Sequence, residues 1–188
     1  KSSLKLHYFR TRHFQAADRC VTPRLLQRLL AAIRTDAHNA RGYRSLIHAD
    51  LSLLQGFECN INSHFHNIFN AGTPVQINRD AGTATLTIAP FKPAKTIKAP
   101  PGATHFSLSF AAAVFDFEGL SFNAGSTSTD TLPLNNKTQS LSALTCTIPT
   151  DSALPVIAVT GIRFYQEVNG AALPLSNGAH NALVIAAV

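Results

Sequence analysis

The sequence of 188 residues contains no tryptophan and no methionine, and only 14% of its residues are charged. The low charge and the 45% of apolar residues exclude an intrinsically disordered chain, which combines high charge with low hydrophobicity. No run approaches the roughly eighteen consecutive apolar residues that a transmembrane helix needs, so we predict no membrane span. The composition predicts a folded globular protein with one medium domain or two small ones.

A methionine is also missing at the start, since the sequence begins with Lys1. We therefore expect a processed or truncated form of a longer product. Residues 1–14 lack the apolar stretch and the small-residue cleavage site of a signal peptide. The low charge and the polar, uncharged surface that it implies are typical of an extracellular protein, so we expect an extracellular or cell-surface location.

The three cysteines, Cys20, Cys59 and Cys146, are an odd number with wide spacing. They match no zinc or redox motif, and no two of them form a CxxC pair. The sequence predicts buried, reduced thiols that behave as small hydrophobes. One disulfide with one free thiol is the alternative.

The positive charge is confined to the first quarter of the chain. Residues 1–50 contain ten basic and three acidic residues, a net charge of +7, whereas residues 51–188 contain six basic and seven acidic ones, a net charge of −1. Most of the basic residues are arginines, which suit bidentate pairing with carboxylates or phosphates. Because no nucleic-acid-binding signature accompanies them, we expect a solvated face or one that contacts acidic groups of a neighbouring subunit. The candidate subunit-contact residues are Arg10, Arg12, Arg24, Arg28, Arg34, Arg41 and Arg44.

The same basic region has the periodicity of helices. Thr22-Pro23 is typical of a helix start, with a hydroxyl N-cap followed by proline at the first helical position. Residues 36–42 are predicted to form a loop, residues 43–54 a second helix that ends near Gly56, and residues 1–18 a further helix. The first helix is predicted to bury one face and to place Arg24 and Arg28 on the opposite face; the buried residues are Leu25, Leu26, Leu29, Leu30 and Ile33.

After Gly56 the hydrophobic period changes to two and β-branched residues become frequent. Turn residues separate the expected strands, among them Asn123-Ala124-Gly125 and Asn169-Gly170, of which the second favours a type I′ hairpin. The expected strands are 57–62, 74–78, 83–88, 104–112, 114–117, 141–148, 156–167 and 183–188. The sequence thus predicts an α+β fold, with a basic helical segment over 1–56 and an antiparallel, immunoglobulin-like β-sandwich over 57–188.

No constellation of residues indicates an enzyme. His64 and His66 would share one strand face and could bind zinc or copper, but the spacing provides no third ligand. Asp116 and Glu118 would also share a face, without the partner across a cleft that a hydrolase needs. The sequence lacks a G-x-S-x-G elbow and a glycine-rich phosphate loop, so we predict no catalytic residue, no metal site and no cofactor.

Several segments of the sequence stand out, namely Gly56–Asn62, Ala99–Phe106, Ile162–Gly170 and Leu173–Leu183, together with Thr35-Asp36 and Ala40–Arg44. Together they resemble a family of uncharacterised proteins from Bacteroidetes-type bacteria. The resemblance covers nearly the whole chain, and the F-Y-Q-E-V-N-G and N-G-A-x-N-A-L motifs are its most specific parts. It implies a helical N-terminal part and a C-terminal β-domain, and it implies no catalytic residues. Similar proteins begin with a glycine-rich, basic arm that is absent here.

These features together predict a non-enzymatic structural subunit that assembles with copies of itself into a filament, tube or surface layer. The basic helical part of one subunit would contact the near-neutral sheet of the next, and such head-to-tail contacts generate open filaments. A sandwich that lacks a strand could also accept one from the next subunit. The alternatives are a module that binds a glycan or a protein, and a nucleic-acid-associated protein that uses the arginine-rich helices, although nucleic acid is the less expected partner.

Overall fold

The structure, a computed structural model, describes residues 16–117, 119, 121–175 and 179–188. It consists mainly of two antiparallel sheets with few helices, as the sequence predicts. The small sheet contains, in spatial order, β1 (Val75–Asn78), β2 (Thr83–Leu86) and β6 (Leu144–Thr147). The large sheet contains β4 (Ser121–Ser128), β3 (His105–Asp116) and β7 (Val156–Val168), with β5 (Leu132–Pro133) also on β3, and β8 (Ala171–Pro174) and β9 (Ala182–Ala187) also on β7.

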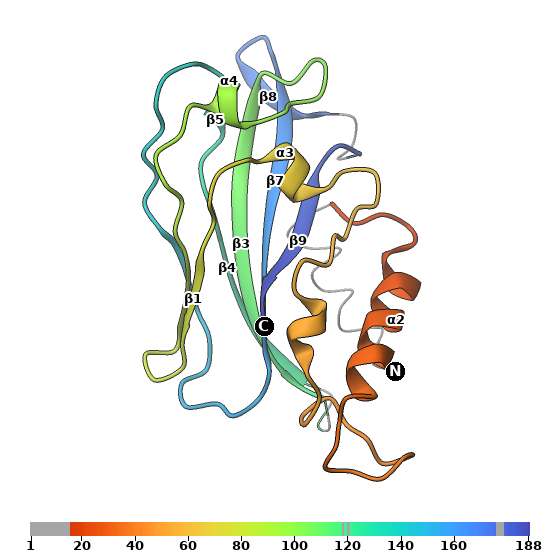
Figure 1. Cartoon of the computed structure of the whole chain (residues 1–188). Helices are drawn as coiled ribbons and strands as arrows, with labels where there is room; N and C mark the ends of the chain where they lie inside the picture. The colour runs from red at the N-terminus through yellow and green to blue at the C-terminus, as the bar shows by residue number, and fades with distance from the viewer. Residues whose placement is uncertain (1–15, 118, 120, 176–178) are drawn as a thin grey trace.

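The elements form three layers. In Figure 1 the small sheet lies at the left, the large sheet in the middle, and helix α2 (Val21–Ile33) at the right. The large sheet therefore has a partner on each of its faces. This explains why β3 and the first nine residues of β7 are almost entirely buried, with apolar residues in continuous runs instead of alternation.

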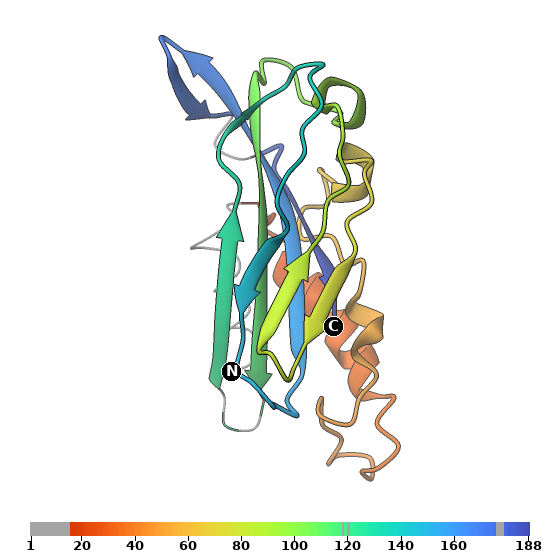
Figure 2. The ribbon, with the colours of Figure 1, turned by 90° about the vertical axis from the view of Figure 1, so that its left-hand side faces the viewer.

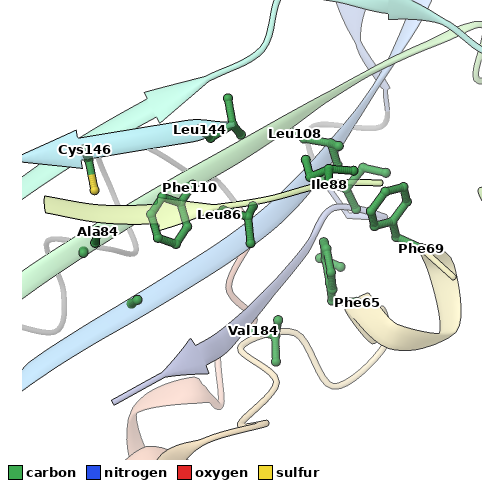
Figure 3. Packing of buried hydrophobic residues seen from close by; sticks show 14 of the residues in the cluster. Phe65, Phe69, Ala84, Leu86, Ile88, Leu108, Phe110, Leu144, Cys146 and Val184 are labelled. Atoms are coloured by element: carbon green, nitrogen blue, oxygen red, sulfur yellow. The ribbon is translucent and has the colours of Figure 1, made fainter. Parts of the chain in front are cut away.

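An inner core fills the space between the two sheets (Figure 3). Alternate residues of β3, namely Phe106, Leu108 and Phe110, point into it and are at most 1% exposed. The short helix α3 (Phe65–Ile68) closes the core beside β9. The residues that face β3 from the small sheet are Ala84, Leu86, Leu144 and Cys146.

An outer core lies between the opposite face of the large sheet and the helical layer. The sheet contributes small side chains here, such as Ala111 and Ala113 of β3, and α2 contributes Leu25 and Leu29. The helical layer and the sheet thus share one core. The division of the chain at Gly56 into two domains stays a prediction.

Helix α2 confirms the first predicted helix but begins earlier and buries fewer residues. Its N-cap is Cys20, not Thr22, and the N–H of Cys20 is bound by the carboxylate of Asp18 (2.6 Å). Leu26 and Leu30 were expected in the core but are 44% and 46% exposed, because the sheet covers only one side of the helix.

The second predicted helix, over residues 43–54, is wrong except for the 3-10 turn η2 (Leu51–Leu54). The buried carboxylate of Asp36 accepts hydrogen bonds from the backbone N–H groups of His38, Asn39 and Ser45, which hold this stretch in a loop. Such local bonds compete with helix formation. The predicted loop over 36–42 is confirmed. The helix predicted over 1–18 lies outside the described residues except for 16–18, which are not helical.

Three strand predictions need correction. The strands expected at 104–112 and 114–117 are one strand, β3, because both of its faces are buried along its whole length. The expected turn at 123–125 lies inside β4, which was not foreseen. Residues 57–62 form only one isolated bridge, between Glu58 and Val184, although backbone hydrogen bonds from 56–59 cover the outer edge of β9.

The remaining short helix is α4 (Pro93–Thr96). Among the described residues, no helix combines the length and the apolar character needed to cross a membrane.

Candidate functional site

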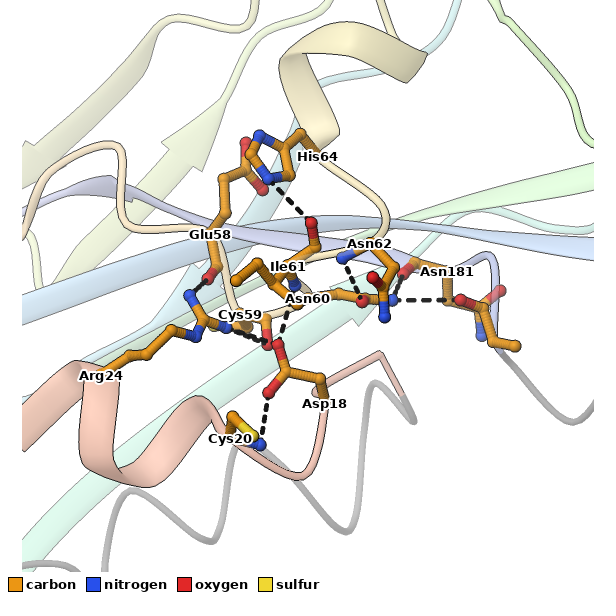
Figure 4. Close-up of polar contacts among 11 residues, drawn as sticks. Asp18, Cys20, Arg24, Glu58, Cys59, Asn60, Ile61, Asn62, His64 and Asn181 are labelled. Atoms are coloured by element: carbon orange, nitrogen blue, oxygen red, sulfur yellow. Dashed lines mark hydrogen bonds and ion pairs between the residues drawn. The ribbon is translucent and has the colours of Figure 1, made fainter.

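A polar network connects the N-terminus of α2 to the edge of β9 (Figure 4). Asp18 is at its centre, and its carboxylate accepts hydrogen bonds from the N–H groups of Cys20 (2.6 Å) and Ile61 (2.8 Å) and pairs with the guanidinium of Arg24. Burial acts to raise the pKa of Asp18, but these hydrogen bonds and the charge of Arg24 outweigh burial, and the pKa lies below its ordinary value.

Arg24, one of the predicted subunit-contact residues, is held inside this network. Its guanidinium also donates to the carbonyls of Glu58 (2.8 Å) and Cys59 (3.2 Å) and lies 5.1 Å from the centre of the Phe57 ring. The side chain is 25% exposed. Arg24 therefore contributes to the fold, because it ties α2 to the segment that covers β9.

The other candidate arginines are placed differently. Arg28, Arg34, Arg41 and Arg44 are exposed, and none of them forms an ion pair with a carboxylate of a described residue. The guanidinium of Arg44 donates to the backbone carbonyl of Arg34 (3.1 Å), which holds the Arg44 side chain beside the end of α2. Arg10 and Arg12 lie outside the described residues.

The two histidines that were considered as metal ligands do not lie on a strand. His64 is the N-cap of α3 and His66 lies within it, on either side of the buried Phe65. The ring of His64 contacts the carbonyl of Ile61 (Nε2–O 3.1 Å). The part of the chain that the structure describes contains no group of three or more side chains suited to holding a metal ion.

Glu58 is the acidic neighbour of these histidines. Its carboxylate accepts the N–H of Phe65 (3.0 Å). Burial raises the pKa of Glu58 above its ordinary value, and the hydrogen bond from Phe65 and the nearby His64 and His66 oppose that rise only in part. The expected carboxylate pair, by contrast, has only Asp116 within the described residues, because Glu118 lies outside them.

All three cysteines are free. The prediction of buried, reduced thiols is confirmed for Cys59 and Cys146 and wrong for Cys20, which is exposed beside the N-terminus of α2. Burial raises the pKa of Cys59 to about 12 and also raises that of Cys146. Neither buried thiol is therefore a nucleophile at neutral pH.

Two hollows open near the edge of β9. A polar one of about 380 Å³ lies between the loop 61–64 and the segment 98–100, and His64, Asn67, Lys98 and His180 line it. The second, of about 510 Å³, separates the N-terminal end of β1 from β9. We call this second hollow the groove; its lining residues include Thr73, Pro74, Val75, Thr160 and Val184–Ala187.

Sequence reasoning missed the groove and one further surface, the hairpin of β7 and β8. Its Asn169-Gly170 turn was predicted, but β8 itself was not. The signal for β8 was present in the apolar residues on either side of that turn, Val168 and Leu173. The groove has no comparable signal, because residues more than a hundred positions apart form it.

The comparisons with known proteins assign no family and no function to these surfaces. No protein-family model, no curated protein and no solved structure matches the chain. The resemblance to the Bacteroidetes family stays a prediction.

Proposed function

We propose that the protein is a non-enzymatic structural subunit that assembles with copies of itself into an extracellular filament, tube or surface layer. The observation that carries this proposal is the set of exposed arginines on the helical layer, Arg28, Arg34, Arg41 and Arg44, which have no carboxylate partner among the described residues. Unpaired guanidinium groups favour a carboxylate-bearing partner. In this proposal, that partner is the β part of the next copy.

Apolar side chains beside these arginines support a protein contact. Leu26 and Leu30 are four residues apart on α2, so they form one exposed stripe, and Tyr43 in the following loop is 82% exposed. The β part offers carboxylates for the charges, since Asp80, Asp130, Asp151 and Glu167 are exposed. An apolar stripe with basic residues around it resembles the arrangement of many protein interfaces, whose centre is apolar and whose rim is polar.

The proposal includes an immunoglobulin-like connectivity for the sandwich. The small sheet in the order β1-β2-β6 and the large sheet in the order β4-β3-β7-β9 support it, because all these neighbouring strands pair antiparallel and the small sheet joins β6 to strands more than fifty residues earlier in the chain. The chain crosses between the two sheets from β2 to β3, from β5 to β6 and from β6 to β7. Folds of this type present their loops and edges to partners and host many unrelated functions, so the function is argued from the surfaces alone.

Sedimentation velocity and electron microscopy of the concentrated, native protein test the proposal. We expect large, ordered particles at low salt. Reversal of three arginines together, Arg28→Glu, Arg34→Glu and Arg41→Glu, should shift most of the protein to single copies. The matched control is Lys137→Glu, which reverses an exposed charge on the β part and should leave assembly unchanged. Arg24 is not used, because its loss would disturb the fold.

A protein that stays monomeric at high concentration and low salt would contradict the proposal. DNA binding that falls steeply with salt would instead favour the nucleic-acid alternative. The logarithm of the binding constant should then fall with the logarithm of the salt concentration with a slope near −0.9 for each phosphate neutralised. Binding of a glycan in the polar hollow by a protein that does not assemble would favour the binding module.

A further inference from the structure

The hairpin of β7 and β8, residues 165–174, extends beyond the rest of the molecule. Figure 2 shows its end projecting past the other strands of the large sheet and away from the small sheet. Its turn is made by Asn169 and Gly170, with φ angles of 52° and 80°, and all four residues of β8 are exposed. The two large apolar side chains on the hairpin, Val168 and Leu173, are 42% and 51% exposed.

These two side chains lie on one face of the hairpin. Gln166 pairs with Leu173 and Val168 pairs with Ala171, and cross-strand partners project to the same side. Further along β7 the same face carries Phe164 into the inner core. The hairpin thus continues the inner face of the large sheet to a place where no described residue of the small sheet covers it.

The outer edge of β8 is free. The N–H of Glu167 donates to the Thr104 hydroxyl (2.7 Å), on the side of β3, so the backbone groups of its neighbours Gln166 and Val168 face β8. By the same alternation, the N–H and C=O of Ala172 face away from β7, and no described residue binds them. The strand has no charged residue of the kind that blocks edge pairing, although its last residue is a proline.

Strand β1 has a second free edge. Thr87 donates to the carbonyl of Pro74 (3.0 Å), so by alternation Gln76 and Asn78 face β2, and the backbone groups of Val75 and Ile77 face outward. Nothing in the described chain binds these outward groups, and β1 also lacks a charged residue. The groove lies directly beside this edge, with Val75 in its lining.

We propose that β8 of one copy adds to the free edge of β1 of the next copy, with Val168 and Leu173 seated in the groove. The occupant is a second copy because one chain carries both halves of the contact. One half is a hairpin with two exposed apolar side chains and a free edge, and the other is a groove beside a second free edge, lined by Val75 and Val184–Ala187 together with polar residues such as His66 and Thr73. The two halves cannot meet within one copy, because the hairpin lies at the top of Figure 1 and β1 lies in the lower half.

This inference rests on the proposed function and adds a second contact to it. The two surfaces differ, so each copy offers one to the copy ahead and the other to the copy behind, and growth continues wherever the rotation does not close a ring. Main-chain hydrogen bonds provide the pairing, as in other cases of strand addition. The contact involves no charged side chain of β1 or β8, so it should resist salt that screens the arginine contact.

Two variants that block one half each provide the test. Leu173→Arg places a charge on the hairpin, and Ala186→Arg places one in the groove while leaving the hairpin intact. Ile61→Arg is the matched control, because Ile61 is 53% exposed and belongs to neither surface. Sedimentation velocity is measured at about 0.5 M salt, where exposed charges interact only over a few ångströms.

We expect the wild type and the control to form species that grow with protein concentration, and each blocked variant to stay as single copies. A mixture of the two blocked variants should form dimers and nothing larger, because one intact hairpin then meets one intact groove. Dimer formation also shows that both variants are folded.

Growth of Leu173→Arg equal to that of the control would overturn the inference and leave the proposed function standing. So would a mixture that stays as single copies while circular dichroism shows both variants folded. Assembly of the wild type at low salt but not at high salt would likewise overturn the inference and leave the proposed function standing. A wild type that assembles in neither condition overturns the proposed function and the inference together.

Discussion

The two faces of the large sheet are packed by different means. The inner face carries bulky apolar side chains such as Phe106 and Phe110, which pack against the small sheet through apolar contacts. The outer face of the same strand carries Ala111 and Ala113, and the helical layer that covers it is also fastened by the charged network of Asp18 and Arg24. The inner layer should therefore respond to changes in side-chain volume, and the outer layer to changes in charge as well.

The largest effect is expected from a cavity in the inner core. Phe110→Ala should lower the free energy of unfolding by about 3–5 kcal/mol, because the side chain is fully buried between two sheets that cannot close around the gap. Urea unfolding measures this loss. Leu173→Ala, on the exposed hairpin, is the control and should change stability by less than about 0.5 kcal/mol. A loss for Phe110→Ala of under 1 kcal/mol would show that the sheets do relax.

The matching change in the outer core should cost less and should act locally. Leu29→Ala is expected to lose about 2–3 kcal/mol. In hydrogen exchange, the amides of α2 should lose protection while those of β3 keep theirs, since loosely attached units open before the rest. Equal loss in both elements would show that the helical layer and the sheet unfold as one unit, and it would remove the case for a domain boundary near Gly56.

The charged network should give a smaller, pH-dependent effect. Asp18→Ala removes the carboxylate partner of Arg24 and the acceptor of two backbone N–H groups, and it should cost about 1–3 kcal/mol at pH 7. The folded pKa of Asp18 is below its ordinary 3.8, so its stabilisation is present above that value and is lost as the pH falls through the folded pKa.

The variant should therefore lose part of the wild type's acid sensitivity below about pH 4. Some sensitivity remains, because hydrogen bonds from Asn39 and Ser45 also hold the pKa of Asp36 well below its ordinary value. Asp130→Ala, at an exposed loop carboxylate, is the control. An unfolding curve for Asp18→Ala with the wild type's full pH dependence would contradict this assignment.

The smallest effect is expected at Glu58, and it has the opposite sign. Its folded pKa lies above the ordinary 4.5, so its favourable contribution is present below that value and is lost as the pH rises through the folded pKa. Glu58→Gln keeps an oxygen for the N–H of Phe65 and removes the charge. We expect a small gain in thermal stability at pH 7 that disappears near pH 3, and a loss at pH 7 would contradict it. Asp80→Asn, at an exposed carboxylate with no ion pair among the described residues, is the control.

Local chemistry explains which parts of the fold the sequence could predict. The leucine spacing located α2, and Asn169-Gly170 located a turn whose two positive φ angles few other residue pairs adopt. In both cases neighbours in the sequence determine the structure. The stretch 43–54 has the same helical spacing, yet the carboxylate of Asp36 accepts a hydrogen bond from the backbone N–H of Ser45. This bond competes with the formation of a helix there.

Long-range contacts explain the parts that could not be predicted. Asn123-Ala124-Gly125 has the composition of a turn, but Gly125 lies inside β4, where the carbonyl of Thr147 in β6 approaches too closely for any side chain. The helical spacing predicts Arg24 on the exposed face of the helix, but the segment 57–61, distant in the sequence, covers it in the structure. Free strand edges cannot be recognised before the neighbours of every strand are known.

That approach at Gly125 has a consequence for the whole sandwich. A Cβ atom there would stand 2.3 Å from the oxygen of Thr147, so the two sheets nearly touch along β4 and β6, whereas the groove separates them along β1 and β9. The sandwich is therefore closed on the side of β4 and β6 and open on the side of β1 and β9. A second chain can approach between the sheets from the open side, while the closed side holds the two sheets in place. Any residue larger than glycine at position 125 would push the two sheets apart on the closed side.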